Sequence, residues 1–323
     1  MDIAYRPLEE ADIPALVSLR DEVERADRTG MHYDVADIRE ELSDPKLDLV
    51  HNTVGMWSGD RMVAFAVLCD PDPVRGVLRF ETNGAVDPAW RRRGLGREII
   101  GWMRTRARAL HAKHDSGAPG ELTLGGVSTN AGLAALAERT GFAPCRYWFT
   151  MSRDLHTTPL PAPAPADLEG LRLVPFAWGY DEAVRLAHNE AFLDHWDYTE
   201  ADEVEWRTWY TGARAFRPDV SAVLLDIDNH VAAYLLADEY VADTAATGRR
   251  TCTVGHLGTR PAHRGKGAAR ALLAHTLQAA GQQGYDRAEL VVDTANPTGA
   301  LGLYESLAFV TDRKLITYAG PLD

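Results

Sequence analysis

Two stretches rich in arginine and glycine, residues 86–96 and 259–269, contain the residues of this chain that are best suited to binding a phosphate group. Their Pro, Arg and Gly residues align without a gap at an offset of 173 residues, which relates Pro88 to Pro261. A similarity of this length indicates a duplicated domain, because the units of repeat proteins are only roughly 20 to 50 residues long.

Each stretch lies between a predicted strand and a predicted helix. The strands are residues 77–86 and 251–257, and the helices are residues 96–113 and 268–283. A helix that begins directly after a strand directs several unpaired backbone N–H groups, and the positive end of its dipole, at one point. Such a point binds phosphate.

Glycines and cations in the two stretches favour the same chemistry. Gly94 and Gly267 allow an anion to approach the backbone without a Cβ in the way, and the neighbouring Arg and Lys side chains can add charge-assisted contacts. Neither stretch is a Walker A loop, because no Gly-Lys-Ser/Thr ends it, and neither has the three-glycine spacing of a dinucleotide site.

The pattern Arg-x-x-Gly-x-Gly/Ala, placed after a strand and opening a helix, resembles the acetyl-CoA pyrophosphate loop of the GCN5-related N-acetyltransferases (GNAT). Residues 296–309 resemble the family segment Asn-x-x-Ala-x-x-Leu-Tyr-Glu-x-x-Gly-Phe, and residues 130–142 keep a weaker version of it. The resemblance implies acetyl-CoA as the cofactor. It implies that the pyrophosphate is bound by Arg91, Arg92, Arg93, Gly94, Leu95, Gly96 and Arg97 in the first copy and by Arg264, Gly265, Lys266, Gly267, Ala268, Ala269 and Arg270 in the second.

Backbone N–H groups of the strand before each loop are expected to hold the thioester carbonyl and the pantetheine arm. The residues are Ala85 and Val86 in the first copy and Leu257, Gly258 and Thr259 in the second. Glycines at 255 and 258 fit a bulged strand that frees such donors, and they fit equally a close approach of helix to strand. Asn296 either caps the following helix or contacts the CoA arm.

A single difference between the copies predicts which one is catalytic. In the resembled family a tyrosine of the last helix lies near the CoA sulfur and serves as general acid, and Tyr304, five residues before Phe309, matches it. The residue five before Phe142 is Ala137. We therefore expect chemistry in the second copy, with a packed tyrosine at the edge of a helix as the alternative interpretation of Tyr304.

The general base is less clearly marked. The second copy has no carboxylate in residues 251–257, and His256 is the group there that titrates near neutral pH. His256 or an ordered water is therefore the predicted base, although a strand histidine is often structural. Glu81 would be the base if the first copy were active.

In the resembled fold, the segment between the first and second strands shapes the acceptor site. Residues 188–199, with Trp206, Trp209 and Tyr210, mix aromatic rings and carboxylates, which suits an ammonium group. The alternative is an amphipathic helix that uses Trp206 and Tyr210 as core anchors.

The predicted domains are residues 1–155, with a degenerate site that keeps its CoA loop, and the catalytic residues 169–323. The Pro/Ala-rich residues 156–168 should form an extended spacer between them. After the spacer, residues 171–175 read as a new first strand. The duplication resembles two-domain acetyltransferases of the mycothiol synthase type, although residues 251–257 lack the carboxylate expected there.

Composition excludes some functions. No apolar run approaches the roughly 20 residues that span a bilayer, and no secretory signal is apparent, so no membrane partner is expected. Three scattered cysteines, Cys69, Cys145 and Cys252, indicate reduced thiols in a cytoplasmic protein. A net charge of −13 argues against nucleic acid and mildly favours a cationic substrate.

We therefore expect an α/β fold of two tandem GNAT-like domains, each a mixed, mainly antiparallel sheet flanked by helices. The expected reaction is transfer of acetyl from acetyl-CoA to a primary amine of a small molecule, by direct attack in a ternary complex and without a metal. The alternatives are acetylation of a protein or peptide, and a non-catalytic acyl-CoA sensor. The sequence leaves the acceptor, the acyl length and the oligomeric state open.

Overall fold

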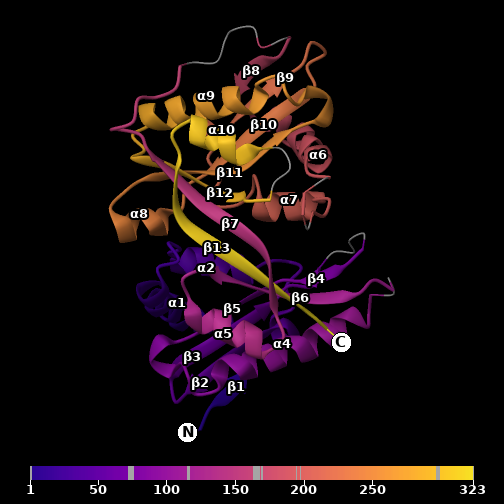
Figure 1. Cartoon of the computed structure of the whole chain (residues 1–323), viewed down its shortest axis with the longest axis vertical. Helices are drawn as coiled ribbons and strands as arrows, with labels where there is room; N and C mark the ends of the chain where they lie inside the picture. Colours follow the sequence, from indigo (N-terminus) through magenta and orange to yellow (C-terminus); the bar gives the residue numbers. More distant parts are fainter. Residues whose placement is uncertain are drawn as a thin grey trace. The chain divides into compact units, whose positions relative to one another are not determined.

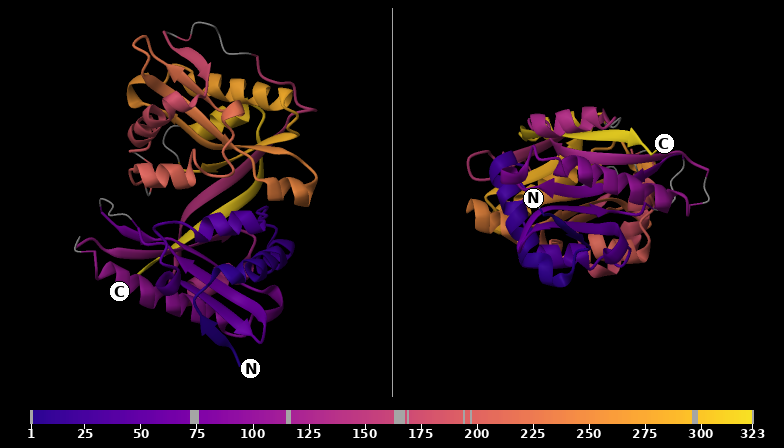
Figure 2. Two further views of the ribbon diagram at one scale, coloured as in Figure 1. Left: turned by 180° about the vertical axis from the view of Figure 1, so that it is seen from behind. Right: turned by 90° about the horizontal axis from the view of Figure 1, so that it is seen from below.

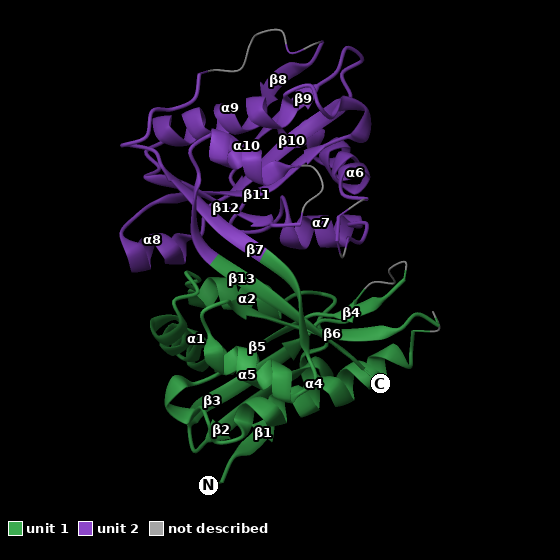
Figure 3. Cartoon of the chain, in the orientation of Figure 1, with its two compact units in different colours: residues 1–147, 314–323 green, residues 148–313 purple. Residues whose placement is uncertain are grey.

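The computed structural model describes residues 2–71, 76–114, 117–162, 168, 170–193, 195–196, 198–295 and 299–322. The chain forms two compact units: unit 1 is residues 1–147 with 314–323, and unit 2 is residues 148–313 (Figure 3). Strand β7 (Ala143–Asp154) begins in unit 1 and ends in unit 2, and β13 (Val310–Pro321) runs from unit 2 into unit 1. The predicted spacer, residues 156–168, falls within unit 2, and residues 163–167 lie outside the described residues.

Unit 1 combines antiparallel and parallel strand pairs. Its strands, besides parts of β7 and β13, are β1 (Ala4–Arg6), β2 (Thr53–Ser58), β3 (Arg61–Leu68), β4 (Leu78–Phe80), β5 (Thr82–Val86) and β6 (Gly120–Val127). Its helices are α1 (Ile13–Asp27), α2 (Val35–Leu42), α3 (Leu49–Asn52), α4 (Leu95–His111) and α5 (Ala131–Arg139). Strands β1-β2-β3-β5 pair in an antiparallel order, while β6 pairs parallel with β4 and antiparallel with β13.

Successive side chains of a strand point to opposite faces, and β3 contributes buried apolar side chains to a core on each face. Helices therefore cover both faces of the unit 1 strands. One core, under α4 and α5, includes Met103 and Ala64. The other, under α1 and α2, includes Leu16, Ile38 and Phe65.

Unit 2 repeats this plan. Its strands are β8 (Arg172–Pro175), β9 (Ala222–Leu225), β10 (Val231–Asp238), β11 (Thr251–Thr259), β12 (Arg287–Asp293) and the second part of β7. Its helices are α6 (Asp181–Ala191), α7 (Glu203–Trp209), α8 (Val241–Thr247), α9 (Ala268–Gln282) and α10 (Ala300–Ser306). Neighbours in the order β8-β9-β10-β11-β12-β7 are antiparallel apart from the parallel pair β11 and β12.

Strand β10 lies between two cores and is buried on both faces. Leu235 and Ala237 face the core that contains α9 and α10, whereas Tyr234 and Leu236 face the core of α6 and α7. The positions of these helices can be followed in Figure 1 and, from behind, in Figure 2. The predicted fold, tandem domains with mixed, mainly antiparallel sheets flanked by helices, is confirmed.

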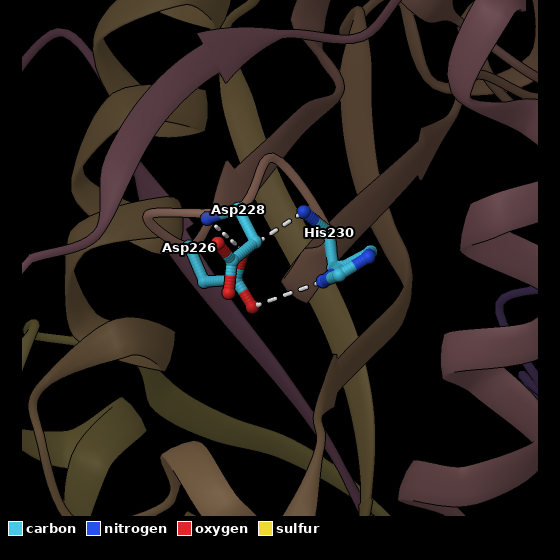
Figure 4. Close-up of side chains that lie close together, drawn as sticks. All are labelled: Asp226, Asp228 and His230. Atoms are coloured by element: carbon cyan, nitrogen blue, oxygen red, sulfur yellow. Dashed lines mark hydrogen bonds and ion pairs between the residues drawn. The ribbon is translucent and has the colours of Figure 1, made fainter.

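The β9–β10 hairpin is closed by an aspartate that accepts two backbone hydrogen bonds. Asp226 Oδ1 accepts from the N–H groups of Asp228 and His230, each at 2.9 Å, and Asp226 Oδ2 lies 3.6 Å from His230 Nδ1 (Figure 4). These contacts are those of an aspartate-stabilised turn. They account for the close approach of the three side chains without a bound ion.

No disulfide joins the cysteines in the described part of the chain. Cys69 and Cys145 are exposed, and Cys252 is buried in β11. Among the helices of the described part of the chain, none is long and apolar enough to cross a membrane.

Candidate active site

Strands β11 and β12 separate partway along their length. Their parallel pairing ends at Val254 and Leu290. Beyond it, β11 continues along β10 to Thr259, and β12 continues along β7 to Asp293. The backbone of residues 256–259 is therefore paired on its β10 edge, and no described ladder joins it to β12.

The separation begins at a β-bulge. His256 pairs with Leu236 but Val254 pairs with Ala237, so Gly255 is an extra residue of β11. A Cβ on Gly255 would lie 2.1 Å from Asp238 Oδ2, so any other residue here would require the Asp238 side chain to move. The predicted bulge is confirmed.

The predicted holders of the thioester and the pantetheine lie beyond the point where β11 and β12 separate. They are Leu257, Gly258 and Thr259, whose backbone pairs with β10 but not with β12. Gly258 is in close contact with its neighbour on β10, because a Cβ there would lie 2.4 Å from Cε1 of Tyr234. In unit 1 the corresponding Ala85 and Val86 pair with β3, while β4 pairs with β6 only as far as Phe80 and Leu122.

The two predicted phosphate loops have the same backbone conformation. In unit 2, Gly265 and Gly267 have φ angles of 79° and 79°, and in unit 1 Arg92 and Gly94 have φ angles of 63° and 98°. Left-handed residues in a tight loop can direct successive N–H groups toward one anion. Arg92 shows that this conformation is kept even where glycine is absent.

Helices α4 and α9 begin without a side-chain cap. Their N-cap residues are Gly94 and Gly267, whereas α7 is capped by Asp202, which accepts from the Glu205 N–H at 2.8 Å. No side chain therefore occupies the N–H groups at the start of α4 and α9, where an anion can bind. Ala268, Ala269, Leu95 and Gly96 form these first turns.

Two of the predicted phosphate ligands form hydrogen bonds with protein atoms. Arg264 donates to the carbonyl oxygens of Thr259 at 3.3 Å and of Ala191, the last residue of α6, at 2.9 Å. Its counterpart Arg91 forms two hydrogen bonds to Asp27 of α1, at 2.7 and 2.8 Å. Both side chains thus hold the loop against a helix, and their role in binding the pyrophosphate stays a prediction.

The other cations of the loops are exposed. Arg93 lies over the Trp90 ring at 4.7 Å, and Arg270 donates to Ser306 Oγ at 2.8 Å. Arg92, Arg97 and Lys266 extend the positive surface of the loops.

Replacing Arg264 with lysine is expected to lower the free energy of unfolding by about 1–3 kcal/mol, because an ammonium cannot reproduce two directed hydrogen bonds. Urea denaturation measures this change. Lys266→Gln is the matched control, and it should leave stability unchanged but weaken acetyl-CoA binding. Unchanged stability of Arg264→Lys together with much weaker binding would identify Arg264 as a phosphate ligand.

Tyr304 lies in α10 with only 8% of its surface exposed. Its ring meets that of Phe309 edge to face, with the centroids 6.0 Å apart. Burial raises the pKa of Tyr304 to about 12, so the hydroxyl keeps its proton at neutral pH. Among the described residues none forms a hydrogen bond with this hydroxyl, which leaves it available to a ligand. The corresponding residue of α5, Ala137, is fully buried.

His256 belongs to a cluster of rings under α6 and α7. Its ring centroid lies 4.5 Å from that of Tyr210 and 5.6 Å from that of His188. His188 Nδ1 lies 2.6 Å from the hydroxyl of Tyr234. Burial lowers the pKa of His256 to about 4 and that of His188 to about 3, so both rings are neutral at pH 7.

The aromatic residues of the predicted acceptor segment divide into two groups. Trp206 is buried, donates to Asp181 Oδ1 at 2.8 Å and stacks on Tyr210, which favours the core-anchor interpretation for this pair. Trp209 is 42% exposed, and the ring centroid of Trp196 lies 6.1 Å from that of Trp148. These two remain candidates for contacting an acceptor.

Sequence reasoning did not identify two groups near the bulge. His188 was part of the acceptor segment but had no predicted role, and Asp238 of β10 was not considered.

Asn296 lies outside the described residues. Its unit 1 counterpart, Asn130, caps α5 by accepting from the Leu133 N–H at 3.0 Å.

Unit 1 keeps the loop but is packed differently behind it. A Cβ on Gly126 of β6 would lie 2.4 Å from Leu133 Cδ2. A Cβ on Gly96 of α4 would lie 2.9 Å from Leu136 Cδ2. Leucines of α5 therefore pack tightly on β6 and α4. Glu81 is exposed between β4 and β5.

This arrangement, a strand that leaves its parallel neighbour at a bulge and ends in an anion-binding loop, defines an acetyltransferase fold. Residues 182–309 match the family model described as Acetyltransferase (GNAT) family. A mycothiol acetyltransferase of Thermobispora bispora is 32% identical over 260 residues, covering 79% of this chain and 78% of that protein. The chain belongs to the GNAT acetyltransferase family and is an acyl-CoA-dependent N-acetyltransferase that uses acetyl-CoA.

Two solved structures match nearly the whole chain. A GCN5-related N-acetyltransferase from Sphaerobacter thermophilus has a TM-score of 0.77 at 22% identity, covering 99% of this chain and 96% of that one. A tandem GNAT protein from the clavulanic acid biosynthesis pathway has a TM-score of 0.73 at 17% identity, covering 100% of this chain and 99% of that one. These likenesses show the tandem fold.

Proposed function

We propose that unit 2 transfers the acetyl group of acetyl-CoA to a primary amine of a small molecule, by direct attack within a ternary complex. The observation that carries this proposal is the position of Tyr304 in the unit whose strand β11 leaves β12 and leads into the loop of α9. Its hydroxyl is protonated and has no hydrogen-bond partner among the described residues. The small-molecule acceptor is supported by the similarity to a mycothiol acetyltransferase, since that name refers to a small molecule.

In this proposal the residues have separate tasks. N–H groups at Gly265–Gly267 and the first turn of α9 bind the pyrophosphate, and Lys266 adds charge. The backbone of residues 257–259 holds the pantetheine arm and the thioester carbonyl. Tyr304 protonates the departing thiolate, and His256 or an ordered water receives the proton of the amine.

We also propose that unit 1 binds acetyl-CoA without turning it over. Support comes from its loop, which has the same pair of left-handed residues and the same uncapped helix as the loop of unit 2. The acid position holds Ala137, which cannot donate a proton.

Calorimetric titration with acetyl-CoA, followed by a thiol-release assay against a panel of amines, tests the proposal. Two binding events with turnover on small amines are the expected result. Turnover only on peptides would overturn the small-molecule acceptor in favour of protein acetylation, and binding without any release would favour an acyl-CoA sensor.

A further inference from the structure

Asp238 is the carboxylate nearest to the β-bulge in the described part of β10 and β11. It is the last residue of β10, and its Oδ2 lies 2.1 Å from the position that a Cβ of Gly255 would occupy. The carboxylate thus lies directly against the residue at which β11 turns away from β12.

The alternation of β10 places Asp238 on the face of the acceptor segment. Tyr234 and Leu236, four and two residues earlier, both belong to the core of α6 and α7, and Asp238 continues that series. His256 pairs with Leu236 and contacts Tyr210 on the same side. Tyr304, in contrast, belongs to the core of α9 and α10 on the opposite face.

The nearby cations are held by the next residue, Glu239. Its carboxylate lies 3.0 Å from Arg217 Nε and 2.7 Å from Arg250 Nε, and it accepts a hydrogen bond from the Tyr285 hydroxyl at 2.8 Å. Among the described residues none forms a hydrogen bond or ion pair with the Asp238 carboxylate.

The pKa values of these two adjacent carboxyl groups are therefore shifted in opposite directions. Hydrogen bonds from Arg250, Tyr285 and Arg217 lower the pKa of Glu239 to about 2, in spite of its burial. Burial raises the pKa of Asp238 from 3.8 to about 7, and the charge of Arg217 only partly offsets this. Among the described residues, the Cys252 thiol of β11 also interacts with Asp238, and burial raises the pKa of this thiol to about 12.

We propose that Asp238 is the group that takes the proton from the acceptor amine, in the place of the carboxylate that β11 lacks. This inference rests on the acetyl transfer proposed above for unit 2. It assigns to a neighbouring strand a task that the sequence analysis gave to His256 or an ordered water.

The step balances as follows. The ammonium group of the acceptor gives one proton to the Asp238 carboxylate, and the freed lone pair forms the C–N bond to the thioester carbon. When the tetrahedral adduct collapses, the second nitrogen proton leaves to solvent, the C–S bond breaks with its electrons on sulfur, and Tyr304 protonates the thiolate. Solvent then restores Tyr304 and accepts the proton held by Asp238.

A base works best when its pKa lies near the working pH, because it is then both ionised and able to hold a proton. Asp238, with a pKa of about 7, meets this condition. His256, with a pKa of about 4, is neutral but accepts a proton poorly.

The test is the pH profile of kcat/KM for wild type, Asp238→Asn and His256→Gln, on an amine that the panel identifies. In the wild-type enzyme, kcat/KM should rise with pH and level off above about pH 7, which gives the profile an ascending limb. Asp238→Asn should lose that limb and roughly 10²-fold or more in kcat, with the affinity for acetyl-CoA unchanged. Glu239→Gln, one residue along, is the matched control and should keep the limb.

A second readout does not depend on turnover. Because the folded pKa of Asp238 lies above its unfolded value, its contribution to stability is present below pH 3.8 and is lost as the pH rises through about 7. Asp238→Asn removes this loss, so its melting temperature should rise relative to wild type between pH 4 and pH 8.

Each outcome has a distinct meaning. A melting-temperature difference that is flat with pH, or a limb that survives in Asp238→Asn and disappears in His256→Gln, would overturn the role of Asp238 while leaving acetyl transfer intact. Absence of turnover by wild type on every amine would overturn the proposed function, and this inference with it.

Discussion

Replacing Tyr304 with phenylalanine is expected to lower kcat for acetyl transfer roughly 10²-fold or more, while the affinity for acetyl-CoA stays the same. The hydroxyl is protonated at neutral pH because burial raises its pKa to about 12, and no described residue uses it in a hydrogen bond. Its loss therefore removes the proton for the thiolate without disturbing the packing of the ring against Phe309. Thiol release under saturating acetyl-CoA measures kcat, and calorimetry measures affinity.

Tyr285→Phe is the matched control for this prediction. Tyr285 is another buried tyrosine of unit 2, but its hydroxyl donates to Glu239. Its loss should reduce stability and leave kcat near the wild-type value. Equal kcat in wild type and Tyr304→Phe would show that Tyr304 is only a packed ring.

Replacing Gly267 with aspartate should abolish most acetyl-CoA binding by unit 2. Like charges brought together cost several kcal/mol, which corresponds to roughly 10²-fold or more in affinity. The φ of 79° at this position adds strain for any residue with a Cβ. Because aspartate is itself a good N-cap, helix α9 should still form. Turnover should fall with the loss of binding.

Gly94→Asp makes the same change at the same position of the unit 1 loop. If both loops bind acetyl-CoA, calorimetry should show one binding event in each single variant, and only Gly94→Asp should retain turnover. Identical titrations of Gly94→Asp and wild type would show that the unit 1 site is empty. Turnover that survives Gly267→Asp but not Gly94→Asp would move the chemistry to unit 1.

Much of this site was predictable because its signals are local. The strand, loop and helix around Gly94 and Gly267 were expected from their spacing, and the structure has them at β5–α4 and β11–α9. A bulge was one of two interpretations of Gly255 and Gly258, since a glycine within a strand marks a bulge or a close approach of another backbone. In each case the neighbours along the chain are also the neighbours in space.

The parts that escaped prediction depend on pairing between distant segments. Asp238 reaches the bulge only because β10 and β11 are antiparallel partners, and nothing in the residues around it shows this register. A sequence shows that Arg264 is positive but not that it points toward Ala191. The low pKa of His256 likewise follows from burial under α6 and α7, which a strand pattern does not reveal.

The course of β7 and β13 limits how this duplicated protein can be divided. Residues 148–154 of β7 pair with β12, and residues 315–321 of β13 pair with β6. A fragment that begins after the proline-rich segment would leave the edge of β12 uncovered, and one that stops before that segment would leave β6 in the same condition. Exposed strand edges promote aggregation. Although the sequence reads as two copies joined end to end, we expect neither copy, cut at the apparent joint, to be a stable protein by itself.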